Sequence, residues 1–337
     1  MSDNSPQSQA DAPGQFRPAP WLRPAAVQTA LASSRLRSRH CKAFGAGAKR
    51  LVLEQRDGLK TTCYVNDRAD ARAMIVLLHG WLGTPGSSYV LSAARALYDA
   101  GFATARLTLP DHGEAALMNE RVVNLTQHEV LHDALAALAR LDGRPIGLMG
   151  FSLGGNYALR IARDLGHAPL PGLRHVFAVS PVIDPGDTCD KVDARPLIRR
   201  YFLNKFARLY RGKQALYPDL LRADEVLRQS TVRAMTTLSV ARWTGFDSVE
   251  AYFDGYRINR GDLGAVQVPV TLLTAQDDPI VSAGPAQMLE PGGNFERLIP
   301  RHGGHNGFFG ASLRANLAED LAKRRFAAMS ARKGRTP

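Results

Sequence analysis

A single serine stands between two glycines where an apolar run gives way to a helical pattern. In the stretch GLMGFSLGGNYALR, residues 147–160, Gly150 and Gly154 lie two positions before and after Ser152. In a sharp turn from a strand into a helix, side chains at those two positions would collide with neighbouring backbone, so glycine is required. Such a turn raises the serine hydroxyl above the sheet, beside helix N–H groups that favour negative charge. The pattern therefore predicts a nucleophile elbow with Ser152 as the nucleophile.

Two later segments could supply the base and the carboxylate that a serine nucleophile needs. A serine hydroxyl is too weakly acidic to attack alone, so an imidazole must accept its proton and a carboxylate must orient that imidazole. The segment TLLTAQDDPIV offers Asp277 or Asp278, and RHGGHNGF offers His305, each after an expected strand. The paired glycines before His305 suit a tight loop over the sheet, whereas we expect His302 at the surface. The chain order serine, acid, histidine predicts a Ser-His-Asp catalytic triad.

A third segment could stabilise the negative charge that develops on the attacked carbonyl oxygen. The sequence HGWLG, residues 79–83, follows the first buried strand. A turn of this type presents a backbone N–H to the reacting oxygen. We therefore expect an oxyanion hole made by the N–H groups of Trp81 and Leu153. Gly80 would let the backbone approach the site, and His79 would support the turn rather than act as an acid or base.

Apolar runs that alternate with helical patterns predict the elements that must position these residues. Short apolar runs indicate strands, and amphipathic or Ala/Leu-rich stretches between them indicate helices. This alternation predicts a mostly parallel sheet with helices on both faces, whose strands end at the site. The expected strands lie within residues 50–66 (an antiparallel pair), 73–80, 102–110, 144–152, 175–183, 268–281 and 295–305, and the expected helices within 87–101, 130–141, 156–166 and 311–326.

Changes in composition along the chain predict its domain organisation. The start is polar and rich in proline, which is typical of disorder, and one later segment has helical patterns without a clear strand. We therefore expect four parts. They are a disordered or irregular N-terminal segment (1–45), an α/β core (46–184 and 263–328), a helical cap insertion (185–262) and a basic C-terminal tail (329–337).

Four segments, taken together and in this order, resemble the α/β-hydrolase superfamily. They are HGWLGTPGSSYV, GFSLGGNYALR, AQDDPIV and HGGHNGFF, and they are most similar to the YheT-like branch of esterases. The resemblance implies the α/β-hydrolase fold with an eight-stranded sheet and a helical cap, and hydrolysis of carboxylic esters through an acyl-enzyme without a cofactor. It also favours Asp278 over Asp277, because an acid followed by Pro-Ile-Val resembles the usual acid turn of these enzymes. The expected activity is that of a carboxylesterase or lipase-like esterase on apolar acyl substrates.

The composition of the chain indicates its expected cellular compartment and the kinds of partner that it could bind. The chain has 337 residues and a net charge of +12, but no aromatic-interleaved basic module, so we expect no nucleic-acid partner. The basic segments could give weak association with a membrane surface, and the expected partner is a small ester or lipid-like substrate. Three scattered cysteines suggest no disulfides, and the start lacks the order of a secretory signal, so we expect a cytoplasmic protein.

Three alternative functions remain open at this stage. Residues 128–132, HEVLH, match the HExxH signature of zinc peptidases, in which His128 and His132 would bind the metal and Glu129 would activate water. No glutamate that could serve as a third ligand lies between Glu129 and Glu225, so we expect no metal site. The other two alternatives are an acyltransferase with the same triad and a non-catalytic binding protein on a hydrolase scaffold.

Overall fold

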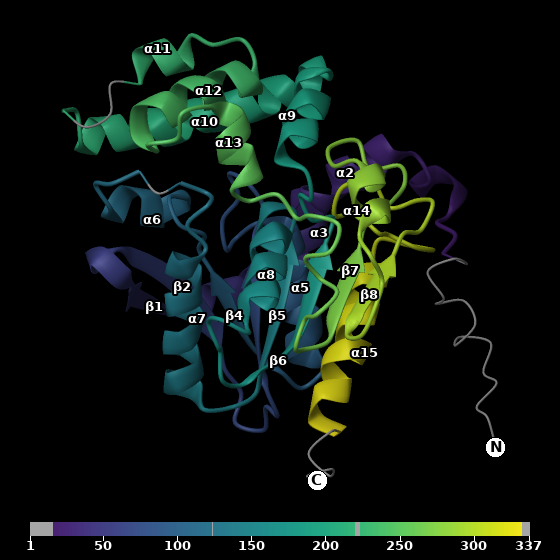
Figure 1. The fold of residues 1–337 in the computed structure, drawn as a ribbon. Helices are drawn as coiled ribbons and strands as arrows, with labels where there is room; N and C mark the ends of the chain where they lie inside the picture. The colour runs from purple at the N-terminus through teal and green to yellow at the C-terminus, as the bar shows by residue number, and fades with distance from the viewer. Residues whose placement is uncertain (1–15, 123, 220–222, 332–337) are drawn as a thin grey trace, which may run out of the picture.

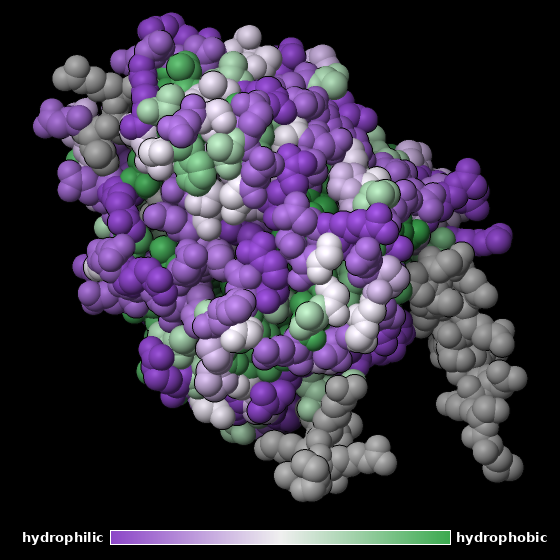
Figure 2. All heavy atoms as spheres, viewed as in Figure 1, coloured by the Kyte–Doolittle hydropathy of each residue, from purple (hydrophilic) through white to green (hydrophobic). Residues whose placement is uncertain are grey.

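The structure is a computed structural model that describes residues 16–122, 124–219 and 223–331. The predictions of disorder for residues 1–15 and of a basic tail for residues 332–337 lie outside these described residues. Figure 1 shows a central sheet with helices on both sides and a group of helices above one end. Figure 2 shows that hydrophilic side chains cover most of the same face, with smaller hydrophobic areas between them.

The centre of the fold is a mixed sheet of eight strands in the order β1-β2-β4-β3-β5-β6-β7-β8. The β1–β2 and β2–β4 pairs are antiparallel and the other neighbours run parallel, as the sequence analysis expected. The middle strands are buried on both faces, which explains their continuous apolar runs. The strands are β1 (Lys49–Glu54), β2 (Lys60–Asn66), β3 (Met74–Leu78), β4 (Ala103–Leu107), β5 (Ile146–Phe151), β6 (Leu173–Val179), β7 (Val270–Leu273) and β8 (Phe295–Leu298).

Helices cover both faces of this sheet, so the predicted fold class is confirmed (Figure 1). Alternate side chains of β3 divide between two cores, since neighbouring strand residues point to opposite faces. Ile75 and Leu77 pack with α5 and α15, whereas Val76 and Leu78 pack with α7 and α8. The helices of the core are α5 (Ser88–Asp99), α6 (Gly113–Met118), α7 (Glu129–Asp142), α8 (Leu153–Asp164), α14 (Ala283–Met288) and α15 (Leu317–Ala331).

The segment between β6 and β7 forms a group of helices beyond the end of the sheet at which β5 meets α8 (Figure 1). In the sequence this segment was expected to be a helical cap, and we keep the name cap for it. None of the described helices is both long enough and apolar enough to cross a bilayer. The cap helices are α9 (Pro185–Asp193), α10 (Pro196–Leu216), α11 (Asp224–Leu227), α12 (Val232–Trp243) and α13 (Val249–Asp254).

The N-terminal segment differs from the sequence-based expectation of disorder or irregularity. Its described part folds into short helices that pack against the core. Their stability comes from tertiary contacts rather than from local propensity, because Gln28 and Arg37 are buried and bond to the far end of the chain. The elements are η2 (Pro20–Leu22), α2 (Ala25–Ala32), α3 (Arg35–Ser38), η3 (Arg39–Cys41) and α4 (Lys42–Ala46).

Candidate active site

Ser152 lies in the turn between β5 and α8 in a strained backbone conformation. Its φ is 55° and its ψ is −116°, a backbone conformation that residues other than glycine rarely adopt. The conformation is held from both sides, because the Ser152 N–H donates to Val179 O at 2.8 Å and the Asn156 N–H donates to Ser152 O at 3.0 Å. Strain that the surrounding structure maintains is typical of functional positions.

The two glycines that flank this turn are required for steric reasons. A Cβ atom on Gly150 would lie 2.1 Å from the carbonyl oxygen of Gly154. A Cβ atom on Gly154 would lie 2.5 Å from the carbonyl oxygen of His79. Both contacts involve backbone, which cannot move aside as a flexible side chain can. The glycine pattern in the sequence therefore reflects the close packing of β3, β5 and α8 around Ser152.

His305 and Asp278 form a buried pair after the last two strands. Nδ1 of His305 lies 2.8 Å from Oδ2 of Asp278, and the carboxyl group is 0% exposed. The other oxygen of Asp278 accepts the N–H groups of Ile280 at 2.8 Å and Val281 at 2.9 Å. Since a carboxylate accepts from Nδ1, that nitrogen carries the proton and Nε2 is left as the basic atom.

The neighbouring candidates of the sequence analysis have different contacts. Oδ1 of Asp277 accepts the Gly304 N–H at 2.9 Å, and its Oδ2 lies 3.4 Å from Nδ1 of His302. Asp277 therefore anchors the loop that carries His305, but it is Asp278 that contacts the His305 imidazole.

Ser152 and His305 line the same open cavity, which has a volume of about 630 Å³. Its walls also include Gly80 and Trp81 of the HGWLG turn and Lys205 of α10. The structure thus gathers segments that are more than 200 residues apart in the sequence around one space that is open to small molecules.

The HGWLG turn passes directly beside the serine. A Cβ atom on Gly80 would lie 3.1 Å from the Cβ of Ser152, and the Gly80 N–H donates to the hydroxyl of Tyr89 at 2.9 Å. The backbone of Trp81 therefore begins next to Ser152. Leu153 is the first residue of α8, and N–H groups in the first turn of a helix have no partner within that helix.

His79 has the structural environment expected for a residue that supports this turn. Its Nδ1 lies 2.8 Å from Gly80 O, and its Nε2 accepts the Leu109 N–H at 3.1 Å. Burial lowers the pKa of His79 to about 3, so the ring is neutral near pH 7. Both nitrogens are thus committed to backbone groups.

The N-terminal helices hold the loop that carries His305, which the sequence analysis did not anticipate. The hydroxyl of Thr29 accepts the His305 N–H at 2.9 Å. The side-chain amide of Gln28 accepts a hydrogen bond from the Phe309 N–H and donates one to Phe309 O, both at 2.9 Å. Arg37 donates to Asn306 O at 2.8 Å. No sequence motif marks these residues, and only their polar side chains within short helical stretches could have hinted at buried partners.

The cap is tied to the HGWLG turn by aromatic packing and by one lysine. The Trp81 ring lies 5.4 Å from the ring of Phe202 and 4.8 Å from that of Phe206, both on α10. Lys205 on the same helix donates to Leu82 O at 3.0 Å, and Leu82 has a positive φ of 54°. These contacts hold the turn beside Ser152 in its strained form.

The HEVLH segment makes other contacts than a zinc site would require. Nε2 of His128 lies 2.7 Å from Oδ2 of Asp164, and Nε2 of His132 lies 3.1 Å from Ala168 O. Among the described residues, no cluster of three histidine, cysteine or acidic side chains is arranged to hold a metal ion. These imidazoles connect α7 to α8 and to the loop that follows it.

Comparison with known proteins identifies the family. The model of the Alpha/beta hydrolase family matches residues 75–318. Protein abhd-3.2 of Caenorhabditis elegans is 26% identical over 251 residues, which cover 71% of this chain and 65% of that protein. The human Monoacylglycerol lipase ABHD2 is 27% identical over 114 residues, which cover 30% of this chain and 27% of that protein. The chain thus spans less than two thirds of the length of these curated relatives.

Solved structures show the same fold at low sequence identity. The Pyrococcus furiosus esterase Pf2001 matches with a TM-score of 0.53 and 15% identity, and the matched region covers 85% of this chain and 92% of the esterase chain. A bacterial membrane phospholipase A matches with a TM-score of 0.54 and 16% identity, and the matched region covers 89% of this chain and 91% of the phospholipase chain. The narrower YheT-like assignment stays a prediction. The sheet topology and the match over residues 75–318 together establish that the chain belongs to the alpha/beta hydrolase family.

Proposed function

We propose that this hydrolase is a serine carboxylesterase in which Ser152, His305 and Asp278 form the catalytic triad. The observation that carries the proposal is the 2.8 Å contact between His305 and Asp278 in a cavity that the strained Ser152 also lines. Esterase and lipase names among the relatives and structural neighbours support the same class of reaction.

The proposed reaction has two stages. Oγ of Ser152 attacks the ester carbonyl while Nε2 of His305 takes its proton, and Asp278 stabilises the imidazolium that results. The oxyanion is stabilised by the N–H groups of Trp81 and Leu153. His305 then returns the proton to the departing alcohol, which leaves an acyl-enzyme. A water molecule, deprotonated by His305, attacks the acyl-enzyme and releases the acid together with the free serine.

The proposal is tested by labelling with a fluorophosphonate and by hydrolysis of short p-nitrophenyl esters. We expect covalent labelling at Ser152, and we expect Ser152→Ala to lose both labelling and hydrolysis while its thermal unfolding is unchanged. Ser230→Ala, at an exposed serine of the cap, is the matched control and should keep both activities. A fully active Ser152→Ala protein would refute the proposal. Absence of labelling would favour a non-catalytic binding protein, and ester products formed with added alcohols would favour an acyltransferase.

We further propose that the mouth of this cavity rests weakly on anionic membrane surfaces. Leu197 and Tyr201, one helical turn apart on α10, line the cavity yet are 85% and 48% exposed. Arg35 and Lys205 line the same cavity, so apolar and cationic groups surround the opening. The protein should float with vesicles that contain phosphatidylglycerol but not with neutral vesicles, and Leu197→Glu should weaken flotation. Equal binding of both vesicle types would refute this proposal.

A further inference from the structure

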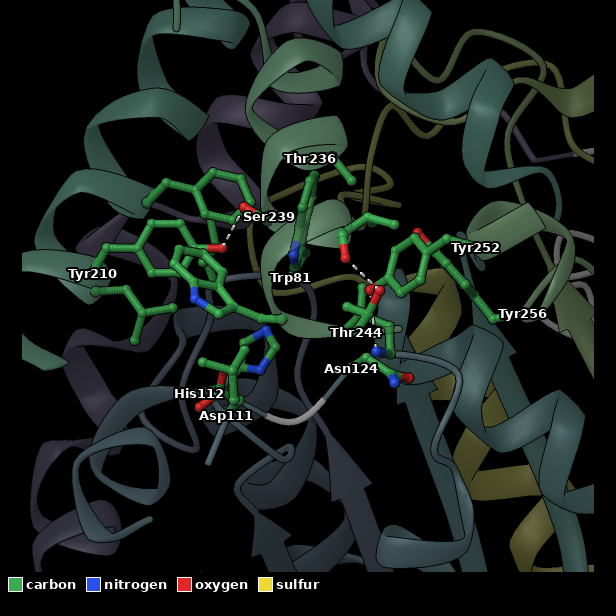
Figure 3. Close-up of a pocket in the computed structure, with 17 residues that line it drawn as sticks. Trp81, Asp111, His112, Asn124, Tyr210, Thr236, Ser239, Thr244, Tyr252 and Tyr256 are labelled. Atoms are coloured by element: carbon green, nitrogen blue, oxygen red, sulfur yellow. Dashed lines mark hydrogen bonds between the residues drawn. The ribbon is translucent and has the colours of Figure 1, made fainter. Parts of the chain in front are cut away.

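A second cavity lies between the sheet and the cap, deeper than the open one. It has a volume of about 70 Å³, whereas a single water needs about 10–15 Å³, so it could hold several waters or a small organic group. Figure 3 shows its labelled side chains converging from the cap and from the loops of the core. Its aromatic wall includes Trp81, Tyr210, Trp243, Tyr252 and Tyr256.

A narrow apolar space of about 30 Å³ lies beside the proposed nucleophile and shares lining residues with this cavity. Ser152 and Leu153 line the narrow space, and Trp81, Leu125 and Tyr256 line both it and the deeper cavity. This adjacency would let an acyl group attached to Ser152 extend under the cap past Trp81, with its far end in the deeper cavity.

The wall of the deeper cavity includes a histidine with one ring nitrogen that has no partner among the described residues. His112 is 3% exposed, and its Nδ1 lies 2.7 Å from Pro110 O, to which it donates. Its Nε2 is buried without a protein partner, and the residue lies on the cavity wall (Figure 3). Burial lowers the pKa of His112 to about 4, so near pH 7 the ring is neutral and Nε2 can only accept.

Other polar side chains on the wall already have partners within the protein. The hydroxyl of Tyr210 lies 3.2 Å from Oγ of Ser239. The hydroxyl of Tyr252 accepts the Leu125 N–H at 3.1 Å, and Asp111 accepts from Lys213. Buried polar atoms are usually paired, so the Nε2 atom of His112 indicates a place for a donor from a ligand.

We infer that the natural substrate is an ester of a compact hydroxy-substituted acid, whose hydroxyl donates to Nε2 of His112. This inference rests on the proposed esterase function, because the acyl group reaches His112 only when its carbonyl lies at Ser152. The apolar body of the acyl group packs against Trp81 and Tyr256, and the hydroxyl fixes how far it extends. A matched acyl group without the hydroxyl leaves the buried acceptor unpaired, which lowers the specificity constant roughly tenfold.

The test uses pairs of p-nitrophenyl esters with the full-length protein. One pair is 3-(4-hydroxyphenyl)propanoate and 3-phenylpropanoate, and the other is 6-hydroxyhexanoate and hexanoate. In at least one pair we expect kcat/KM for the hydroxylated ester to exceed that of its partner by about tenfold. Ratios of one or less in both pairs would overturn the inference, since the cavity would then hold only water or apolar groups.

The variant His112→Phe removes the acceptor and keeps a ring of similar size beside His79, whose ring centroid is 5.3 Å away. We expect its preference for the hydroxylated ester to fall to one or below, while the ester without the hydroxyl is hydrolysed as fast or faster. His167→Phe, at an exposed histidine that does not line this cavity, is the control and should keep the wild-type preference. A preference that survives in His112→Phe overturns the inference. Should that variant fail to fold, the wild-type ratios decide.

Failure of this inference can be distinguished from failure of the proposed function. Fluorophosphonate labelling at Ser152 together with equal hydrolysis of both members of each pair would remove only the role of His112. Absence of labelling and of all ester hydrolysis would remove the esterase proposal, and the inference with it.

Discussion

Replacing Thr29 with valine tests whether the N-terminal helices position the proposed catalytic base. The Thr29 hydroxyl accepts the His305 N–H at 2.9 Å and donates to Ala25 O at 2.8 Å. Valine has nearly the same shape but no acceptor, so the His305 N–H loses its partner beside the open cavity. An unpaired buried donor costs about 1–3 kcal/mol. Thr29 is only half-buried, so water can replace part of the bond and the lower end of this range applies.

A cost of about 1.4 kcal/mol corresponds to a tenfold change in the fraction of molecules with His305 correctly placed. We therefore expect kcat on a p-nitrophenyl ester to fall about tenfold in Thr29→Val, with little change in KM, because Thr29 acts through His305. The rate of fluorophosphonate labelling should fall by the same factor. Thr29→Ser keeps the hydroxyl and should restore both rates.

Three results would refute this reasoning. They are a Thr29→Val protein with wild-type kcat, a serine variant as impaired as the valine variant, and a loss that appears only in KM. Thermal unfolding of each variant separates the effect on His305 from a general loss of stability.

The remaining predictions concern the acid, the turn and the pH dependence of stability. Asp278→Asn should lower kcat by about 10⁴-fold and Asp277→Asn by less than tenfold in ester hydrolysis, because only the former contacts the imidazole. Gly150→Ala should lower the free energy of unfolding in urea by about 3 kcal/mol, whereas Gly261→Ala, with open space around it, should change it little. The pKa of buried His112 is lowered to about 4, so the unfolded chain binds more protons below pH 6.5. Urea unfolding should therefore show stability falling from pH 6.5 towards 4, by about 3 kcal/mol for this residue, and less in His112→Phe. A flat pH profile, or equal effects within the aspartate or glycine pairs, would contradict these expectations.

The sequence indicated the segments that form the candidate site because each has a local signature. Gly150 is constrained by Gly154 and Gly155, which are close in the chain, whereas Gly154 is constrained by Leu78 and His79 at the end of β3. The two adjacent aspartates, however, could not be separated by local reasoning alone. The structure shows that Asp278 reaches His305 and that Asp277 reaches Gly304, which depends on how two loops pack together.

The described part of the N-terminal segment, which follows the polar residues 1–15, shows a limit of reasoning from composition. Polar and proline-rich sequence predicts that a chain cannot bury enough apolar surface to fold by itself. Gln28 and Arg37 are nevertheless buried, because their partners, Phe309 and Asn306, lie more than 260 residues later. Contacts over such a separation leave no periodicity in the sequence by which they could be found.

The sequence by itself indicated the alternation of strands and helices, the strained turn at Ser152 and the order of the proposed catalytic residues. The strands and helices arise from the periodic burial of apolar side chains, which is a pattern between near neighbours in the chain. The glycines at the turn also reflect the neighbouring strand β3, which a Cβ on Gly154 would meet. Only the tertiary structure decided which carboxylate faces His305, which helices hold its loop and which histidine lines the cavity under the cap. Those outcomes depend on hydrogen bonds between distant segments, and such bonds form only after the sheet, the cap and the N-terminal helices have packed together.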